Sequence, residues 1–132
     1  MCAGGAGDAG YALECLRAAA DGGAENVTLC DTNGASLPHE VAEATAAVVE
    51  AIGARVAIHC HNDAECGVAN SLAAVDAGAR LVQGTMNGYG ERTGNANLIS
   101  ILPALQLKLG YEVVPPERLR LLTETSHFVA EL

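Results

Sequence analysis

Hydrophobic positions along this chain alternate between a helical spacing and short apolar runs. Spacings of three and four residues predict helices over residues 10–21, 38–52, 64–77 and 97–109, and another from residue 115 to the end of the chain. Apolar runs bounded by glycine or polar residues predict strands over residues 25–31, 55–61 and 81–85. We expect Ser36 to cap the second helix and Pro103 to bend or shorten the fourth. Residues 1–9 carry no periodic pattern, which predicts a ragged or disordered N-terminus.

Strands and helices alternate through short connections, which is typical of parallel βαβ units. Doubly wound sheets and (β/α)₈ barrels are both built from such units, and the periodicity does not choose between them. The strand over residues 55–61 favours a barrel. Every second residue from Val56 to Cys60 is apolar and suits a helix layer, whereas the other face becomes polar at His59 and His61. A barrel strand has this pattern when chemistry takes place at its carboxyl end.

Two histidines therefore lie two residues apart at the end of this strand. Alternate residues of a strand point to the same side, roughly 6.5–7 Å apart, so the imidazoles of His59 and His61 can converge on one divalent cation. The pair by itself fits equally well two partly buried, hydrogen-bonded histidines. Its place at a strand end, followed by Asn62 and Asp63 as a loop and helix cap, favours a metal site.

A glycine-rich segment, residues 87–97, follows the third strand. Its glycines allow the backbone to approach a ligand closely, and Glu91, Arg92, Asn95 and Asn97 offer polar contacts. Taken alone, the segment favours an ordinary turn with a helix cap at Asn95 or Asn97, but it follows a strand that we expect to lie next to the strand of His59 and His61.

The first strand also ends in polar residues. Thr32 shares a face with Thr28 and Cys30, which directs its hydroxyl toward the mouth of a barrel, although a plain turn is an equally good interpretation. Because the carboxyl ends of parallel strands meet at one edge, the three polar strand ends predict a shared site.

Composition excludes several classes of function. Seven Lys and Arg against sixteen Asp and Glu give a net charge of −9, and with one Phe, three Tyr and no Trp the chain lacks the basic, aromatic surface of a nucleic-acid-binding protein. No apolar run is long enough for a membrane span. The five cysteines form no C-x-x-C pair and have no neighbouring base, which favours reduced thiols in the cytoplasm over disulfides, a zinc cluster or a nucleophile. We expect His39 and His127 to be solvated or to pack.

Three motifs together resemble the 2-isopropylmalate synthase/citramalate synthase family: LCDTNG at residues 29–34, HCHND at 59–63 and GTMNGYGERTGNAN at 84–97. The forms here are most similar to the citramalate synthase branch. The family consists of metal-dependent acyltransferases on a TIM barrel, related to HMG-CoA lyase. The resemblance implies an α/β fold: a partial TIM (β/α)₈ barrel with about three βα units, the last strands of the barrel, plus a C-terminal helix. Residues 10–114 would form this C-terminal half, and residues 115–132 a helix leading to an absent accessory region.

The resemblance also implies roles for individual residues. His59, His61 and Asn95 would bind a divalent metal (Zn, Mn or Mg), Thr32 would hydrogen-bond the carboxylate of a 2-oxo acid, and Glu91 would be a catalytic acid on the acyl-CoA side. The reaction implied is condensation of acetyl-CoA with a 2-oxo acid, in branched-chain amino acid biosynthesis. Pyruvate, giving citramalate, is favoured over 2-oxoisovalerate, giving 2-isopropylmalate. The full-length protein would be a homodimer that engages neither nucleic acid nor membrane.

The chain departs from the family at its N-terminal side. The family has an Arg-Asp motif on its first strand, which supplies a carboxylate ligand, and no such strand exists here. A whole barrel takes about 250 residues, so we expect the chain alone to be inactive. A degenerate half-barrel with weak metal binding and a fragment of a lyase such as HMG-CoA lyase are the alternatives. An amidohydrolase-type enzyme is rejected because the strand after His61 supplies neither His nor Asp.

Overall fold

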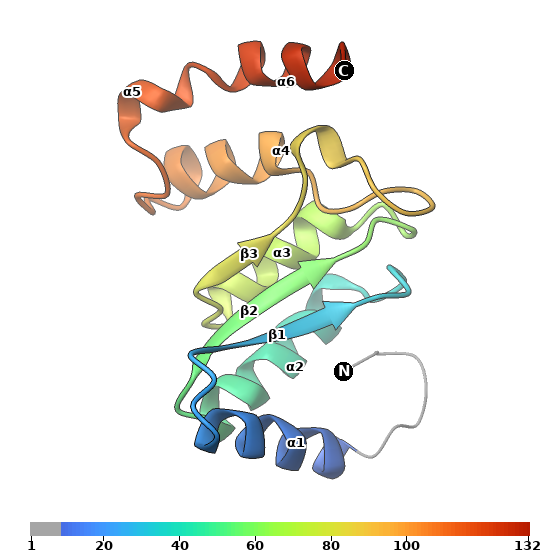
Figure 1. Ribbon diagram of the computed structural model, residues 1–132, viewed down its shortest axis with the longest axis vertical. Coiled ribbons are helices and arrows are strands. Elements are labelled where there is room, and N and C mark those ends of the chain that lie inside the picture. The colour runs from blue at the N-terminus through green and yellow to red at the C-terminus, as the bar shows by residue number, and fades with distance from the viewer. Residues whose placement is uncertain (1–8) are drawn as a thin grey trace.

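The computed structural model describes residues 9–132 and contains one parallel sheet (Figure 1). Strands β1 (Asn26–Asp31), β2 (Arg55–Cys60) and β3 (Leu81–Gln83) are hydrogen-bonded in the order β1-β2-β3. Both strand pairs are parallel, as predicted. The register pairs Asp31 with Cys60 and His59 with Gln83, so the carboxyl ends of all three strands lie at the same edge.

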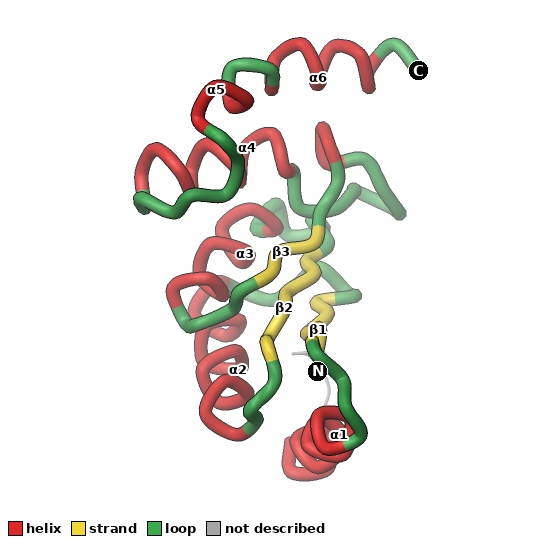
Figure 2. The backbone as a smooth tube through the Cα atoms, turned by 60° about the vertical axis from the view of Figure 1, so that its left-hand side comes forward, coloured by secondary structure: helices red, strands yellow, loops and turns green. Residues whose placement is uncertain are grey.

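Helices cover one face of this sheet. Helix α1 (Ala9–Asp21) precedes β1, and α2 (Pro38–Ala51) and α3 (Gly67–Asp76) connect successive strands and pack side by side on the same face (Figure 2). The core lies between this helix layer and the apolar side chains of β1 and β2, as the alternation along residues 55–61 predicted. On the opposite face, Thr28, on β1, accepts a 3.3 Å hydrogen bond from Gln83, on β3, so the two side chains bridge the strand between them.

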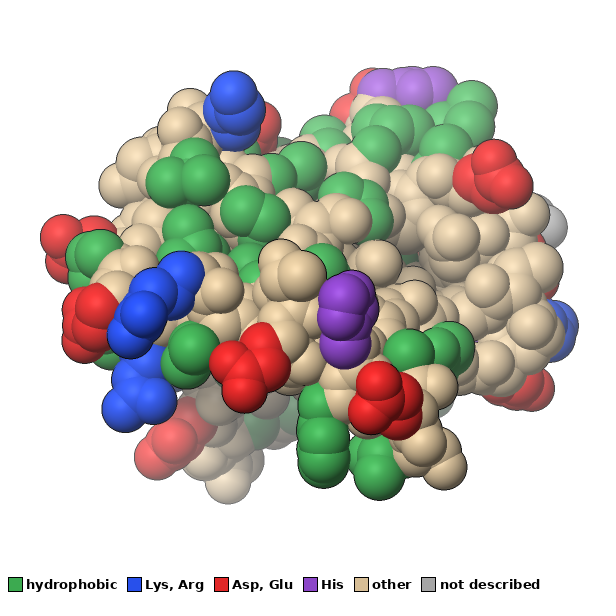
Figure 3. Space-filling view, turned by 90° about the horizontal axis from the view of Figure 1, so that it is seen from above, with side chains coloured by type: hydrophobic (Ala, Val, Ile, Leu, Met, Phe, Trp, Pro, Cys, Tyr) green, Lys and Arg blue, Asp and Glu red, His purple; other side chains and the backbone are tan. Residues whose placement is uncertain are grey.

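The C-terminal part adds a helical layer beyond β3. A short 3₁₀ turn, η1 (Met86–Gly88), is followed by α4 (Leu98–Pro103), which continues as a π-helical segment, η2 (Ala104–Lys108). The single final helix that we predicted is two helices, α5 (Pro116–Leu119) and α6 (Leu122–Ala130). Viewed from the α6 end, hydrophobic side chains lie exposed beside charged ones (Figure 3), and Phe128 is among the exposed ones. Within residues 9–132, no helix is both long and apolar enough to cross a membrane.

Two local expectations are wrong. Leu37, and not Ser36, occupies the N-cap position of α2, where no side chain caps the helix. The Ser36 hydroxyl instead donates a 3.0 Å hydrogen bond to the buried carboxylate of Asp31. The third strand ends at Gln83 because Thr85 pairs with the returning glycine-rich segment. Of the nine residues expected to be ragged, the first eight lie outside the described part, and Ala9 begins α1.

A matched pair of substitutions tests where the core lies. Ile101 on α4 is 1% exposed, whereas Leu107 on η2 is 68% exposed. Truncating a buried isoleucine removes its transfer free energy and leaves a cavity, so we expect Ile101→Ala to lower the free energy of unfolding by about 2–5 kcal/mol. Leu107→Ala should change it by less than about 0.5 kcal/mol. Urea unfolding followed by circular dichroism measures both; equal effects would contradict this placement of the core.

Candidate metal centre

The polar end of β2 carries two imidazoles that lie close together. His59 belongs to β2, and His61 follows its last residue, so both project from the sheet face that no helix covers. Their ring centroids are 5.2 Å apart at an interplanar angle of 67°, and His61 is 8% exposed. Two imidazoles at this separation can supply nitrogen ligands to one cation between them.

The glycine-rich segment returns to the end of β2 through backbone hydrogen bonds. Ala96 N–H donates to the Cys60 carbonyl (2.9 Å), and Asn62 N–H donates to the Gly94 carbonyl (3.0 Å). These two bonds flank the pair formed by His61 and Asn95, which face each other in an antiparallel bridge. In a pair of this kind the side chains lie on the same side and the Cα atoms are about 4.5 Å apart. Asn95 is therefore held against His61 by main-chain geometry.

The side-chain amide of Asn95 forms a hydrogen bond through its nitrogen but not through its oxygen. Its Nδ2 donates to the carbonyl of Tyr89 (3.2 Å), whereas its Oδ1 is buried and has no hydrogen-bond partner. A buried acceptor without a partner costs about 1–3 kcal/mol unless something else satisfies it. Amide oxygens are good ligands for hard divalent cations, so the partnerless Oδ1 of Asn95, a residue that lies opposite His61 in the bridge, fits a metal ligand.

This donor set is partial. Across residues 9–132 no three His, Cys, Asp or Glu side chains gather into a metal-binding group. The candidate site consists of His59 and His61 with Asn95, which lies opposite His61. Two nitrogens and one amide oxygen leave at least one coordination position for a further ligand, as catalytic metal sites do. The set does not by itself select Zn²⁺, Mn²⁺ or Mg²⁺.

Thr32 and Glu91 lie at the same edge of the sheet. Their contacts do not by themselves indicate what either side chain does. The Thr32 carbonyl accepts a 2.6 Å hydrogen bond from Arg92, which fixes the end of β1 beside the glycine-rich segment. The Glu91 side chain is 70% exposed, and its carboxylate lies 3.5 Å from Arg92 Nη1. Their proposed roles toward a 2-oxo acid and acyl-CoA remain expectations from the resemblance.

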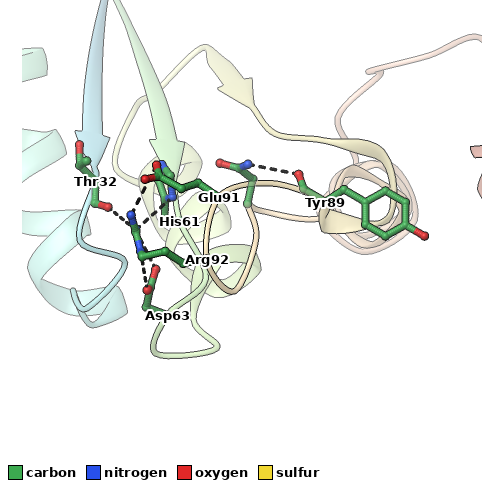
Figure 4. Close-up of polar contacts among 7 residues, drawn as sticks. Thr32, His61, Asp63, Tyr89, Glu91 and Arg92 are labelled. Atoms are coloured by element: carbon green, nitrogen blue, oxygen red, sulfur yellow. Dashed lines mark hydrogen bonds and ion pairs between the residues drawn. The ribbon is translucent and has the colours of Figure 1, made fainter. Parts of the chain in front are cut away.

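The residue that joins these elements is Arg92 (Figure 4). Its guanidinium donates to both carboxylate oxygens of Asp63, at 2.8 and 3.0 Å, and its Nη2 also lies 3.2 Å from His61 Nδ1. The hydrogen bond from Arg92 holds the pKa of the Asp63 carboxyl below its ordinary value. In the sequence, Arg92 is only one of several polar residues in a loop. The one sequence signal for its partner is that Asp63 follows the strand that ends in His59 and His61.

The glycine-rich segment is also tied to the C-terminal helices. Asn87 Nδ2 donates to the Ser126 carbonyl (2.8 Å), and the Ser126 hydroxyl donates back to Asn87 Oδ1 (2.6 Å). Asn97 caps α4 through a hydrogen bond from Ile99 N–H, so the predicted helix cap is confirmed. Helix α6 thereby fixes the start of the segment, and α4 fixes its end.

Cys60 and the two other histidines, His39 and His127, differ in their burial. Cys60 faces the helix layer and is fully buried, and burial raises the pKa of its thiol to about 12. A thiol with such a pKa is neutral and a poor nucleophile at pH 7. His39 and His127 are exposed and lie on α2 and α6, away from the end of β2.

Comparison with known proteins identifies the family. The model of the HMGL-like family matches residues 2–129, nearly the whole chain. The chain belongs to the HMGL-like family. It is 63% identical over 123 residues to the (R)-citramalate synthase of Aquifex aeolicus, a match that covers 92% of this chain and 23% of that protein. It is 41% identical over 126 residues to the 2-isopropylmalate synthase of Sulfolobus acidocaldarius, covering 95% of this chain and 32% of the relative.

Solved structures decide between the two α/β architectures. The HMG-CoA lyase of Bacillus subtilis superposes with a TM-score of 0.78 at 22% identity, over 95% of this chain and 43% of the lyase. The three parallel βα units are thus part of an HMGL-like TIM barrel, and the doubly wound alternative is excluded. The predicted family and fold class are confirmed. The chain spans about a quarter of the length of the citramalate synthases it matches.

The packing of Asn95 against Gly90 generates a test of the site's geometry. A Cβ atom at Gly90 would overlap the Asn95 side-chain amide, whereas one at Gly53 meets nothing within 4 Å. We expect Gly90→Ala to displace the Asn95 side chain and to shift its NH₂ signals in a ¹⁵N–¹H spectrum, with Gly53→Ala as the matched control. Unchanged Asn95 signals in Gly90→Ala would show that the side chain does not pack where the structure places it.

Proposed function

We propose that this chain contributes the metal-binding part of a barrel that condenses acetyl-CoA with a 2-oxo acid. Residues 10–114 would form three βα units of that barrel, with residues 115–132 as the helical connection that follows. The proposal is supported by two imidazoles whose ring centroids lie 5.2 Å apart and by Asn95, which lies opposite His61 and has a partnerless Oδ1. The names of the relatives support the chemistry, since both (R)-citramalate synthase and 2-isopropylmalate synthase are among them.

The residues at the strand ends would each have a separate role in the reaction. His59, His61 and Asn95 would hold the cation. When bound, a divalent cation polarises the carbonyl of a 2-oxo acid as a Lewis acid. Thr32, at the end of β1, would orient the substrate carboxylate through its hydroxyl. Glu91, exposed at the outer side of the segment, would act on the acyl-CoA side, where a carboxylate can accept or return a proton.

Pyruvate is the favoured 2-oxo acid, with citramalate as the product, because relatives that are 48–63% identical carry the name (R)-citramalate synthase. The 2-isopropylmalate synthase of Sulfolobus acidocaldarius is 41% identical. Condensation of acetyl-CoA with 2-oxoisovalerate is therefore the second candidate. Either reaction serves branched-chain amino acid biosynthesis, and we propose a cytoplasmic protein that forms a homodimer at full length.

Removal of the imidazoles tests the ligand assignment. We expect His59→Ala/His61→Ala to weaken Zn²⁺ and Mn²⁺ binding by more than the roughly 10–100-fold that loss of an outer-shell partner costs. The control is His39→Ala/His127→Ala, which removes two exposed imidazoles from α2 and α6. Isothermal titration calorimetry and metal content after dialysis measure both variants. Equal binding by the wild type and the His59/His61 variant would remove the assignment.

A chimera tests catalytic competence without requiring the chain to act alone. Three strands cannot close an eight-stranded barrel, so we expect the isolated chain to release no CoA from acetyl-CoA with pyruvate. Placed in the (R)-citramalate synthase of Aquifex aeolicus instead of the matching segment, the chain should support CoA release, measured with a thiol reagent. The chimera that carries His59→Ala/His61→Ala is the control. A folded, metal-loaded chimera without activity would favour the degenerate half-barrel.

A further inference from the structure

Asn70, on α3, carries a fully buried side-chain amide that the proposed function does not use. We propose that Asn70 is a positioning residue, which acts through Ser36 and Asp31 to fix the turn that carries Thr32. This inference rests on the proposed role of the Thr32 hydroxyl toward the carboxylate of a 2-oxo acid. It extends the site to a helix that does not itself reach the strand ends through Thr32.

Asn70 lies where a helix normally presents an apolar side chain to the core. Residues buried on α3 recur at spacings of three and four, and they are Gly67, Asn70, Ser71, Ala74 and Val75. An amide at such a position loses its hydration and must recover hydrogen bonds inside the protein. The Nδ2 atom of Asn70 donates a 2.8 Å hydrogen bond to the carbonyl of Ser36, whereas its Oδ1 has no partner among residues 9–132. A half-satisfied amide contributes little to stability, so the donor is what explains this residue.

The acceptor of that hydrogen bond belongs to a second buried contact. Ser36 is 2% exposed, and its N–H and Oγ donate to the two carboxylate oxygens of Asp31, at 3.3 and 3.0 Å. Asp31 is the last residue of β1, so Ser36 links the end of that strand to Asn70 on α3. Hydrogen bonds to a carboxylate are stronger than those between neutral groups. Residues 32–35 are therefore enclosed between two ends that are both held in the interior.

This enclosed turn carries the Thr32 hydroxyl. The Gly34 N–H donates to the Asp31 carbonyl (3.1 Å) and closes the turn. Thr32 itself is exposed, and its carbonyl accepts a hydrogen bond from Arg92 at the surface (Figure 4). An exposed side chain is placed only as precisely as the backbone that carries it. Water competes with the surface bond but not with the buried chain of hydrogen bonds that begins at Asn70, so the buried chain is the firmer restraint.

Amide hydrogen exchange measures the restraint without substrate or metal. Asn70→Leu removes the donor at similar side-chain volume, and Ser71→Ala is the matched control, because Ser71 is equally buried on α3 but its hydroxyl bonds within that helix. We expect the Gly34 and Ser36 amides of Asn70→Leu to exchange about tenfold faster than in the wild type, the effect of one lost hydrogen bond. Ser71→Ala should leave them unchanged relative to the Ile58 amide of β2. Equal acceleration at Ile58 in Asn70→Leu would indicate general destabilisation and would refute the positioning role.

A double-mutant cycle tests whether Asn70 acts through Thr32. In the chimera with the (R)-citramalate synthase of Aquifex aeolicus, we expect Asn70→Leu and Thr32→Val each to raise the KM for pyruvate about tenfold, with the KM for acetyl-CoA unchanged. Once Thr32 has lost its hydroxyl, Asn70→Leu should raise the KM for pyruvate by less than about twofold, because coupled residues are not additive. Ser71→Ala should leave both KM values unchanged. Independent, multiplying effects of the two substitutions would overturn the proposal.

These results separate the positioning role from the proposed function. If the folded chimera with the unaltered chain is inactive, the proposed function fails, and the role of Asn70 in the reaction fails with it. If the chimera is active and Thr32→Val raises the KM for pyruvate, but Asn70→Leu changes neither this KM nor the exchange at Gly34, the proposed function stands and the role of Asn70 is refuted. Should Asn70→Leu fail to fold, Ser36→Ala breaks the next bond of the same chain and must give the same pattern.

Discussion

The site depends on main-chain hydrogen bonds that fold the glycine-rich segment back across the end of β2. The bonds at Cys60 and Asn62 set His61 directly opposite Asn95, and a further bond from Thr85 N–H to the Ala96 carbonyl (3.1 Å) anchors the same segment beside β3. This backbone pairing determines the side on which each side chain lies, because opposite residues in such a bridge share a face. Gly94, with φ at 108°, adopts a backbone conformation that L side chains rarely reach, and this allows the return.

The same constraint explains why the polar groups gather at one end of the sheet. Parallel pairing brings the carboxyl ends of the strands to the same edge of the sheet. The residues after β1, β2 and β3 therefore lie near one another because of the strand pairing alone. Arg92 then joins the three strand ends through Thr32, Asp63 and His61. On the other face, α2 and α3 bury the apolar residues of β1 and β2. The polar groups therefore gather at the carboxyl ends of the strands, which is where the active site of a TIM barrel lies.

Local pattern was sufficient to predict the elements but not every long-range partner. The period of two along residues 55–61 correctly assigned Cys60 to the helix side and His59 to the polar side, because a strand alternates whatever surrounds it. Ser36 was misassigned as a cap because its actual partner, Asp31, is a buried carboxylate that its hydroxyl satisfies. The Arg92 contacts with Thr32 and His61 join residues 60 and 31 positions apart. Spacing along the chain carries no information about such contacts.

We propose that two imidazoles and the Asn95 carboxamide bind one cation. X-ray absorption at the metal edge of the Zn²⁺- or Mn²⁺-loaded chain measures this most directly, because imidazole rings give a distinct multiple-scattering signature. We expect two imidazole ligands on one metal, with oxygen completing the shell. A spectrum that shows one imidazole or none would contradict it.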